Sequence, residues 1–143
     1  MSCAEILALT LRAEAGTRPV RAIEALAALV VNRARMAAEG TVPRARFTPD
    51  ARAGAGWAGL LAEVCRAPFL FRCWQPGGLR AEAPADAAME ICRRVARRAQ
   101  GGALPDPTAG ATHWHDGASL PGWAIGQVPT AEIGGLVFYR LPA

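Results

Sequence analysis

The chain has 143 residues, enough for one domain with a hydrophobic core of its own. Its content of 52% hydrophobic residues excludes an intrinsically disordered chain, and no apolar run is long enough to cross a bilayer. The formal charge is +4 and all sixteen basic residues are arginine, which suits an anionic partner such as nucleic acid or an acidic wall polymer. We therefore expect a single domain over residues 1–143.

The first element in chain order is a helix whose two ends are marked in the sequence. Ser2 and Glu5 have the spacing of a capping box, so the helix is expected to begin at Ser2. Gly16 is typical of the position just beyond a helix end. The buried side of this helix is expected to consist of Ile6, Leu7, Leu9 and Leu11.

Glu14 falls in the last turn of this helix, beside the start of the next one. The negative end of the helix dipole and partial burial both favour the protonated form of a carboxyl group there. A carboxylic acid that keeps its proton near neutral pH can protonate a leaving-group oxygen. From these residues alone, the alternative is an ordinary solvated glutamate at a helix end.

A second, mostly apolar helix follows Pro19, a residue that suits the first turn of a helix. Apolar residues recur at helical spacing from Ile23 to Val31, and the pattern ends before Gly40. Because the apolar character is broad, this helix is expected to be central and buried on most sides. Asn32 lies next to the apolar stripe and either orders a neighbouring loop or lies at the helix edge.

The middle of the chain alternates between predicted helices and irregular segments. Residues 40–56 are rich in Gly, Pro and Arg and are predicted to form a loop, and a short helix is expected over Trp57–Arg66. An extended aromatic segment is expected over Phe69–Trp74, and Pro84 opens a further helix that ends at Gln100.

The helix that ends at Gln100 carries a cluster of arginines on one face, at i and i+4 spacing. A solvated face is the ordinary interpretation of such a cluster. A nucleic-acid-binding surface is the alternative, although no recognised DNA-binding motif accompanies it. The cluster consists of Arg93, Arg94, Arg97 and Arg98.

Beyond Gly102 the helical period is lost and Gly and Pro punctuate short segments. Short strands are expected over residues 111–115 and 136–141. The class is therefore α+β, mainly helical, with a small β region towards the C-terminal end.

Four cysteines occur without the C-x-x-C spacing of a metal knuckle. One disulfide among the last three is possible, and buried free thiols are the alternative. The cysteines are Cys3, Cys65, Cys73 and Cys92.

Two histidines in the first predicted strand share a face, because alternate residues of a strand point to the same side. His113 and His115 therefore lie opposite Trp114. Three interpretations compete: histidines satisfied by backbone partners, a sugar-binding groove of imidazoles and indoles, and a metal site completed by Asp116 or Glu14.

Several motifs occur in the order that is typical of one bacterial family. The chain resembles the bacterial cell wall hydrolases of SleB/CwlJ, spore cortex-lytic, type from about residue 4 to residue 140. The motifs are Ala13-Glu14-Ala15, Val31-Asn32-Arg33, Phe71-Arg72-Cys73-Trp74, the run from Asp106 to His115, and the ending Pro121-Gly122-Trp123-Ala124, Ile133-Gly134, Phe138-Tyr139-Arg140.

This resemblance implies a peptidoglycan-cleaving enzyme with a lysozyme-like or lytic-transglycosylase-like fold, in which Glu14 is the catalytic acid and base. It implies that the β region faces the catalytic helix across a glycan-binding cleft. No organic cofactor is implied and no metal ligand is assigned, and we expect a monomer that acts on glycan strands. The residues assigned to substrate binding are Trp74, Thr112, His113, His115, Tyr139 and Asn32.

The chain departs from the family pattern near Glu14, where Gly16 replaces a basic residue and Arg18 an acidic one. An arginine beside Glu14 would favour its ionised form, so the acid role depends on where Arg18 points. Elsewhere, Leu136 stands at a common His position and Arg72 at a common Ser position.

A glycosidase that uses water normally needs two carboxylates, whereas a lytic transglycosylase needs one. Since Glu14 alone has a strong claim, we favour a lytic transglycosylase over an N-acetylmuramidase. Asp116, Asp106 and Glu24 are the candidate second carboxylates for hydrolysis. A non-catalytic peptidoglycan-binding module and, less favoured, a nucleic-acid-binding domain are the alternatives.

The start of the chain lacks a basic flank followed by an apolar segment, so no secretory signal peptide is visible. We therefore expect a protein that is made in the cytoplasm and reaches the wall by release or delivery. A phage- or prophage-type lysin would behave in this way.

Overall fold

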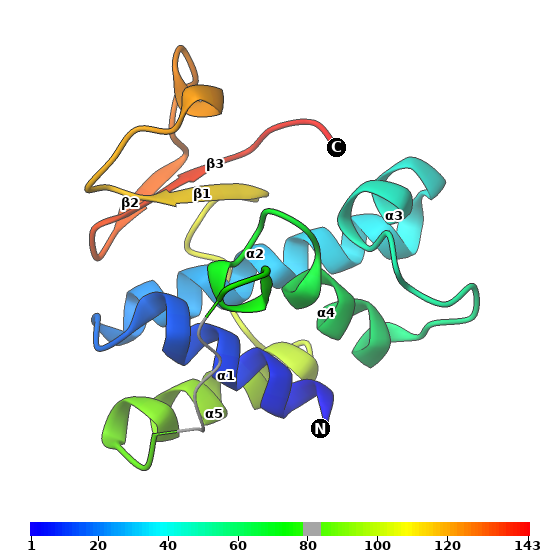
Figure 1. Ribbon diagram of the computed structural model, residues 1–143, viewed down its shortest axis with the longest axis horizontal. Coiled ribbons are helices and arrows are strands. Elements are labelled where there is room, and N and C mark those ends of the chain that lie inside the picture. Colours follow the sequence, from blue (N-terminus) through cyan, green and yellow to red (C-terminus); the bar gives the residue numbers. More distant parts are fainter. Residues whose placement is uncertain (79–83) are drawn as a thin grey trace.

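The computed structural model describes residues 1–78 and 84–143, and Figure 1 shows helices followed by a small sheet. The mainly helical α+β class predicted from the sequence is confirmed. None of the helices in the described ranges is long and apolar enough to cross a membrane. The elements are α1 (Cys3–Ala15), α2 (Val20–Glu39), α3 (Thr41–Phe47), α4 (Trp57–Arg66), the 3₁₀ turn η1 (Arg72–Trp74), α5 (Ala87–Gln100), β1 (His113–Asp116), the 3₁₀ turn η2 (Gly122–Ala124), β2 (Ala131–Ile133) and β3 (Leu136–Tyr139).

Both ends of α1 form as the sequence predicts. The Ser2 side chain accepts a hydrogen bond from the Glu5 N–H at 3.2 Å and caps the first turn. Gly16 has a φ of +62°, a value that disfavours any residue with a Cβ, and its N–H donates to the Arg12 carbonyl at 3.1 Å. This sharp exit lets the chain turn directly into α2.

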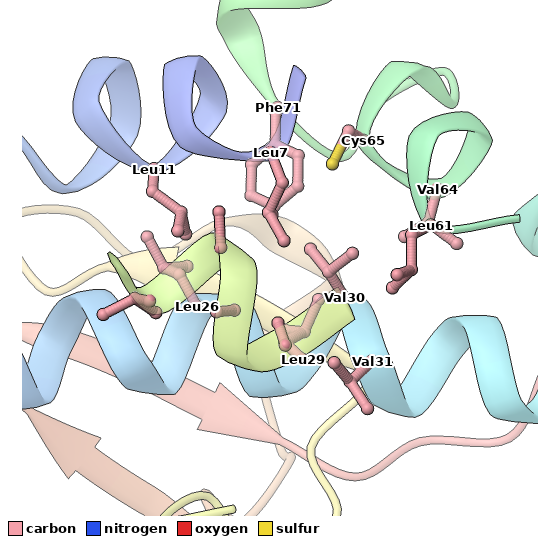
Figure 2. Packing of buried hydrophobic residues seen from close by; sticks show 14 of the residues in the cluster. Leu7, Leu11, Leu26, Leu29, Val30, Val31, Leu61, Val64, Cys65 and Phe71 are labelled. Carbon is pink, nitrogen blue, oxygen red and sulfur yellow. The ribbon is translucent and has the colours of Figure 1, made fainter. Parts of the chain in front are cut away.

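Helix α2 is the centre of the molecule, as its broad apolar pattern predicts. Figure 1 shows it running between the sheet on one side and α1 and α5 on the other, and α4 also packs against it. Figure 2 shows side chains of α1 and α4 meeting those of α2 in one continuous core. The labelled side chains there are Leu7, Leu11, Leu26, Leu29, Val30, Val31, Leu61, Val64, Cys65 and Phe71.

The three antiparallel strands have the order β1-β3-β2. Trp114 lies opposite Phe138, and this pair shares a face with the fully buried Leu136. His113, which pairs with Tyr139, faces the other side. The sheet therefore has a core face and an outer face.

The turn between β2 and β3 packs directly against the start of α2. At Gly134, where φ is +58°, a Cβ would lie 2.8 Å from the Ala22 Cβ, so only glycine permits this approach. Leu136, at a position where the family commonly has His, is fully buried in the core.

Residues 40–56 contain helix α3, so the predicted loop is wrong there. Pro43 occupies the first turn, where its missing N–H costs no hydrogen bond, and the helix ends where Thr48 N–H and Oγ1 both bond to the Arg44 carbonyl. The element is stabilised by a tertiary contact: Phe47 is 1% exposed, and the Arg33 guanidinium lies 4.4 Å from its ring centroid.

Three further expectations are corrected. The segment Phe69–Trp74 does not continue as a strand but coils into η1, and the sheet has a third strand, β2. In addition, α5 begins at Ala87 rather than at Pro84, because the Asp86 side chain caps it by accepting from the Met89 N–H at 2.8 Å.

Candidate active site

Glu14 lies in the last turn of α1, and its carboxylate is held by a distant part of the chain. The Cys73 N–H in η1 donates to Glu14 Oε1 at 3.0 Å. One turn earlier on the same helix, Thr10 Oγ1 accepts from the Trp74 indole N–H at 2.7 Å. Two residues at i and i+4 of α1 thus clamp η1, and η1 in return orients the Glu14 carboxylate.

The Glu14 side chain lines a cavity of about 410 Å³, a size within the range of small-molecule sites. Its described walls come from α1 and from the segment 72–78, and they contain no strand residue. Gly78 is required in that wall, since a Cβ there would lie 2.1 Å from the Arg72 carbonyl oxygen. The described lining residues are Ala13, Glu14, Arg72, Cys73, Gln75, Pro76, Gly77 and Gly78.

Arg18 points to the sheet and its bonds are to groups other than Glu14. Its guanidinium donates to Asp116 Oδ2 at 2.9 Å, to the Gly134 carbonyl at 3.1 Å and to the Ala15 carbonyl at 3.3 Å. The replacement of an acidic residue by Arg18 therefore ties the α1–α2 corner to the sheet. The acid role of Glu14 does not have to compete with an ion pair to Arg18.

Each of the three candidate second carboxylates is engaged in a different contact. Asp116 pairs with Arg18, and Glu24 pairs with Arg98 at 3.3 Å. Asp106 holds together the turn that precedes β1 by accepting from the N–H groups of Thr108 and Gly110, each within 2.9 Å.

Burial raises the pKa of Asp106, but its hydrogen bonds outweigh burial. These bonds come from Thr108, Asn32 and Gly110, and they bring the pKa below its ordinary value. Asp106 is thereby kept as an ionised structural acceptor.

The outer face of the sheet carries an aromatic cluster, defined as His113, His115, Trp123 and Tyr139. His115 stacks on Tyr139 with 5.4 Å between ring centroids, and its Nε2 lies 2.8 Å from the Tyr139 hydroxyl. Its Nδ1 lies 2.8 Å from the Asp116 carbonyl, so Nδ1 carries the proton that donates to it. Trp123 of η2 packs over both histidines and Tyr139 with centroid distances of 5.2–5.8 Å, and it is 43% exposed.

His113 is kept neutral at pH 7. Burial, followed by the nearby charges of Arg33 and Arg46, lowers the pKa of His113 to about 4. Its ring meets the edge of Phe47 at 6.5 Å, which links the aromatic cluster to α3.

Three other predicted site residues make bonds within the protein. Asn32 Nδ2 donates to Asp106 Oδ2 at 3.0 Å and to the Ala111 carbonyl at 2.9 Å, so it orders the neighbouring loop. Thr112, 2% exposed, exchanges hydrogen bonds with the backbone of Leu141. The third, Trp74, is bonded to Thr10 as described above.

The structure brings Glu14 and Trp74 together at the α1–η1 junction and collects His113, His115 and Tyr139 on the sheet. Their assignment to substrate binding stays a prediction. The parts of the site that sequence reasoning missed are the Cys73 N–H and the Gln75–Gly78 wall. A backbone donor cannot be recognised from side-chain patterns, and the residues Pro76-Gly77-Gly78 of the wall indicate only a turn.

Cys3, Cys65 and Cys92 are free thiols, and Cys65, Cys73 and Cys92 are buried. Burial raises the pKa of the Cys65 thiol to about 12 and that of Cys92 to about 11, so both are protonated at neutral pH. Within the described part of the chain, no three His, Cys, Asp or Glu side chains form a group that could hold a metal ion.

Comparison with known proteins gives one family and two similar structures. A family model described as "Cell Wall Hydrolase" matches residues 18–139, a range that begins just after Glu14. The catalytic domain of the Bacillus cereus SleB protein is similar at a TM-score of 0.63 and 17% identity, covering 96% of this chain and 89% of that one. The catalytic domain of the germination-specific lytic transglycosylase SleB from Bacillus anthracis is similar at a TM-score of 0.64 and 18% identity, covering 96% and 93%. A search of curated proteins gives no match.

Proposed function

Because the chain belongs to the cell wall hydrolase family, we propose that it cleaves peptidoglycan glycan strands with Glu14 as general acid and base. The observation that carries this proposal is the Glu14 carboxylate at a cavity of about 410 Å³, oriented by the Cys73 N–H. An oriented carboxylate at a cavity is the arrangement that proton transfer to a bound substrate requires. The fold shared with the two SleB catalytic domains agrees with it.

The bond to Cys73 determines which oxygen of Glu14 carries the proton. Oε1 accepts from the Cys73 N–H at 3.0 Å, so a protonated Glu14 holds its proton on Oε2. In the first step this proton moves to the glycosidic oxygen of the muramyl unit as the bond from that oxygen to the anomeric carbon breaks. The resulting carboxylate is then available as a base at the same place.

In the second step Glu14 takes the proton of the muramyl 6-hydroxyl, whose oxygen bonds to the anomeric carbon. The product is a 1,6-anhydro end, no water is consumed, and the 6-hydroxyl proton returns Glu14 to its protonated form, while the first proton stays on the leaving group. We favour this lytic transglycosylase route over hydrolysis because Asp116, Asp106 and Glu24 are all engaged elsewhere. The name of the Bacillus anthracis relative agrees with this choice.

The other predicted site residues support the site in different ways. Trp74 positions η1, and we propose that Asn32 and Thr112 position the loop before β1 and its connection to the C-terminal residues. Within the aromatic cluster, Trp123 is the exposed ring, the two histidines are half-buried and Tyr139 is buried, so we propose that Trp123 offers a glycan strand the largest surface. These residues are proposed to shape the surface rather than to take part in proton transfer.

Mass spectrometry of soluble products from purified peptidoglycan tests the reaction type. Wild type is expected to release fragments with 1,6-anhydromuramyl ends, and Glu14→Gln to release them about 10²–10⁴-fold more slowly. Reducing muramyl ends would contradict the transglycosylase route and favour hydrolysis with a second carboxylate. Sedimentation with the wall without any released fragment would contradict catalysis and favour a non-catalytic binding module.

A further inference from the structure

The loop between α4 and η1 presents one aromatic ring to solvent in an unfavourable backbone conformation. Phe69 is 97% exposed and has a φ of +69°. Bulky residues rarely adopt this left-handed region, and a glycine there would remove the strain. A phenylalanine that is both strained and fully hydrated contributes nothing to the core, which points to a role outside folding.

The loop is braced from the cavity wall and from the sheet. Gln75 lines the cavity, and its Nε2 donates to the Ala67 carbonyl at 3.1 Å and to the Phe71 carbonyl at 2.9 Å, on either side of Phe69. The Trp114 indole N–H donates to the Leu70 carbonyl at 3.3 Å. These bonds hold the backbone on both sides of Phe69 in place and so fix the point from which its exposed side chain projects.

A few residues after Phe69, the same segment contacts the Glu14 carboxylate. Phe71 is fully buried and anchors the chain, and the next turn delivers the Cys73 N–H to Glu14. The ring of Phe69 thus belongs to the continuous piece of chain that forms both the support of Glu14 and a wall of the cavity.

We propose that Phe69 is a sugar-binding platform that stacks on a pyranose ring of the glycan strand, next to the unit held at Glu14. This inference rests on the proposed function. A glycan strand is longer than a cavity of about 410 Å³ can enclose, so flanking sugar units pass over the wall that Gln75 and its loop form. A pyranose presents a face of C–H groups that packs on an aromatic ring, and a braced backbone leaves only the side-chain torsions of Phe69 to be ordered on binding.

Binding is measured in the Glu14→Gln background with glycan strands freed of their stem peptides, so that cleavage does not interfere. Phe69→Ala is expected to raise Kd about tenfold, whereas Phe69→Trp is expected to keep it. Phe69→Gly is expected to weaken binding equally while raising the thermal unfolding midpoint, since it relieves the backbone strain. Val42→Ala, at an apolar side chain that is 67% exposed on α3, is the matched control and should change neither quantity.

An unchanged Kd in Phe69→Ala would overturn the proposal. The proposal would also be overturned if Phe69→Ala weakened binding only to strands that still carry stem peptides. A lowered unfolding midpoint in all three Phe69 variants, together with weaker binding, would overturn it too. If Glu14→Gln binds strands and Phe69→Ala weakens this binding, but wild type releases no fragments, the platform stands and the proposed catalysis fails. No strand binding by Glu14→Gln itself would overturn the platform.

Discussion

The cavity beside Glu14 and the outer face of the sheet both present polar side chains, but the hydrogen bonds of these side chains differ between the two regions. In the aromatic cluster, His115 is bonded at both ring nitrogens, to the Asp116 carbonyl and to the Tyr139 hydroxyl. At the cavity, one bond from the Cys73 N–H orients the Glu14 carboxylate. Side chains that use their hydrogen-bonding atoms on one another, as in the aromatic cluster, stabilise the local structure. A carboxylate that is oriented at a cavity, as Glu14 is, can exchange a proton with a bound substrate.

Substitution of a glycine by alanine is expected to give the largest difference in cleavage rate between the two regions. Gly78→Ala places a Cβ 2.1 Å from the Arg72 carbonyl oxygen, so the segment that carries the Cys73 N–H must shift. We expect about a 100-fold loss of peptidoglycan cleavage, because small misplacements of catalytic groups have effects of that size. Initial rates of fragment release check this prediction.

Gly122→Ala is the control for the sheet region, since a Cβ at this position of η2 meets nothing within 4 Å. Its cleavage rate should match wild type. Equal losses in both glycine variants would mean that the outer face matters as much as the cavity wall.

A smaller effect is expected from removing one hydroxyl in each region. Thr10→Val keeps the volume but removes the hydroxyl that accepts from the Trp74 indole N–H. We expect a loss of about 1–3 kcal/mol in the free energy of unfolding and a lower cleavage rate, since η1 loses one of its two clamps. Urea unfolding and initial rates measure the two effects.

Tyr139→Phe removes the hydroxyl that bonds to His115 Nε2. The expected loss is about 0.5–1.5 kcal/mol in the free energy of unfolding, with a cleavage rate within about twofold of wild type. A larger loss of rate in Tyr139→Phe than in Thr10→Val would place the aromatic cluster in the catalytic machinery.

The smallest expected effect is a dependence of stability on pH that comes from the sheet. The pKa of His113 is about 4 in the folded protein against an ordinary 6.5. Between these values the unfolded chain binds the proton and the folded chain does not, so stability falls as the pH drops from about 6.5 to 4. Thermal unfolding midpoints of wild type and His113→Gln over this range should show a shallower pH dependence in the variant, and parallel curves would contradict the assignment.

The elements that the sequence predicts well are those with local end signals. Ser2 and Gly16 mark α1 because capping is a contact between near neighbours in the chain. Helix α4 keeps its predicted bounds, Trp57–Arg66, although no side chain caps its start, because Pro68 ends the helical pattern locally. Helix α3 escapes prediction because its stability depends on Phe47, whose partners Arg33 and His113 are distant in sequence.

The candidate site is only half visible in the sequence for a related reason. Glu14 can be singled out as a carboxyl at a helix end that matches a family motif. The segment Phe69–Trp74 looks extended by composition, yet it coils so that the Cys73 N–H meets Glu14, 59 residues away in the chain. Backbone donors and strained positions such as Phe69 depend on tertiary packing, which composition and spacing do not record.

The most direct test of the account is the rate of fragment release by Glu14→Gln. The glutamine oxygen still accepts from the Cys73 N–H, so η1 should stay in place while the proton donor is lost. Glu132→Gln, at an exposed glutamate of β2, is the matched control. We predict a rate about 10²–10⁴-fold below wild type for Glu14→Gln with an unchanged unfolding midpoint, and a wild-type rate for the control. A folded Glu14→Gln that cleaves peptidoglycan at the wild-type rate would contradict the account.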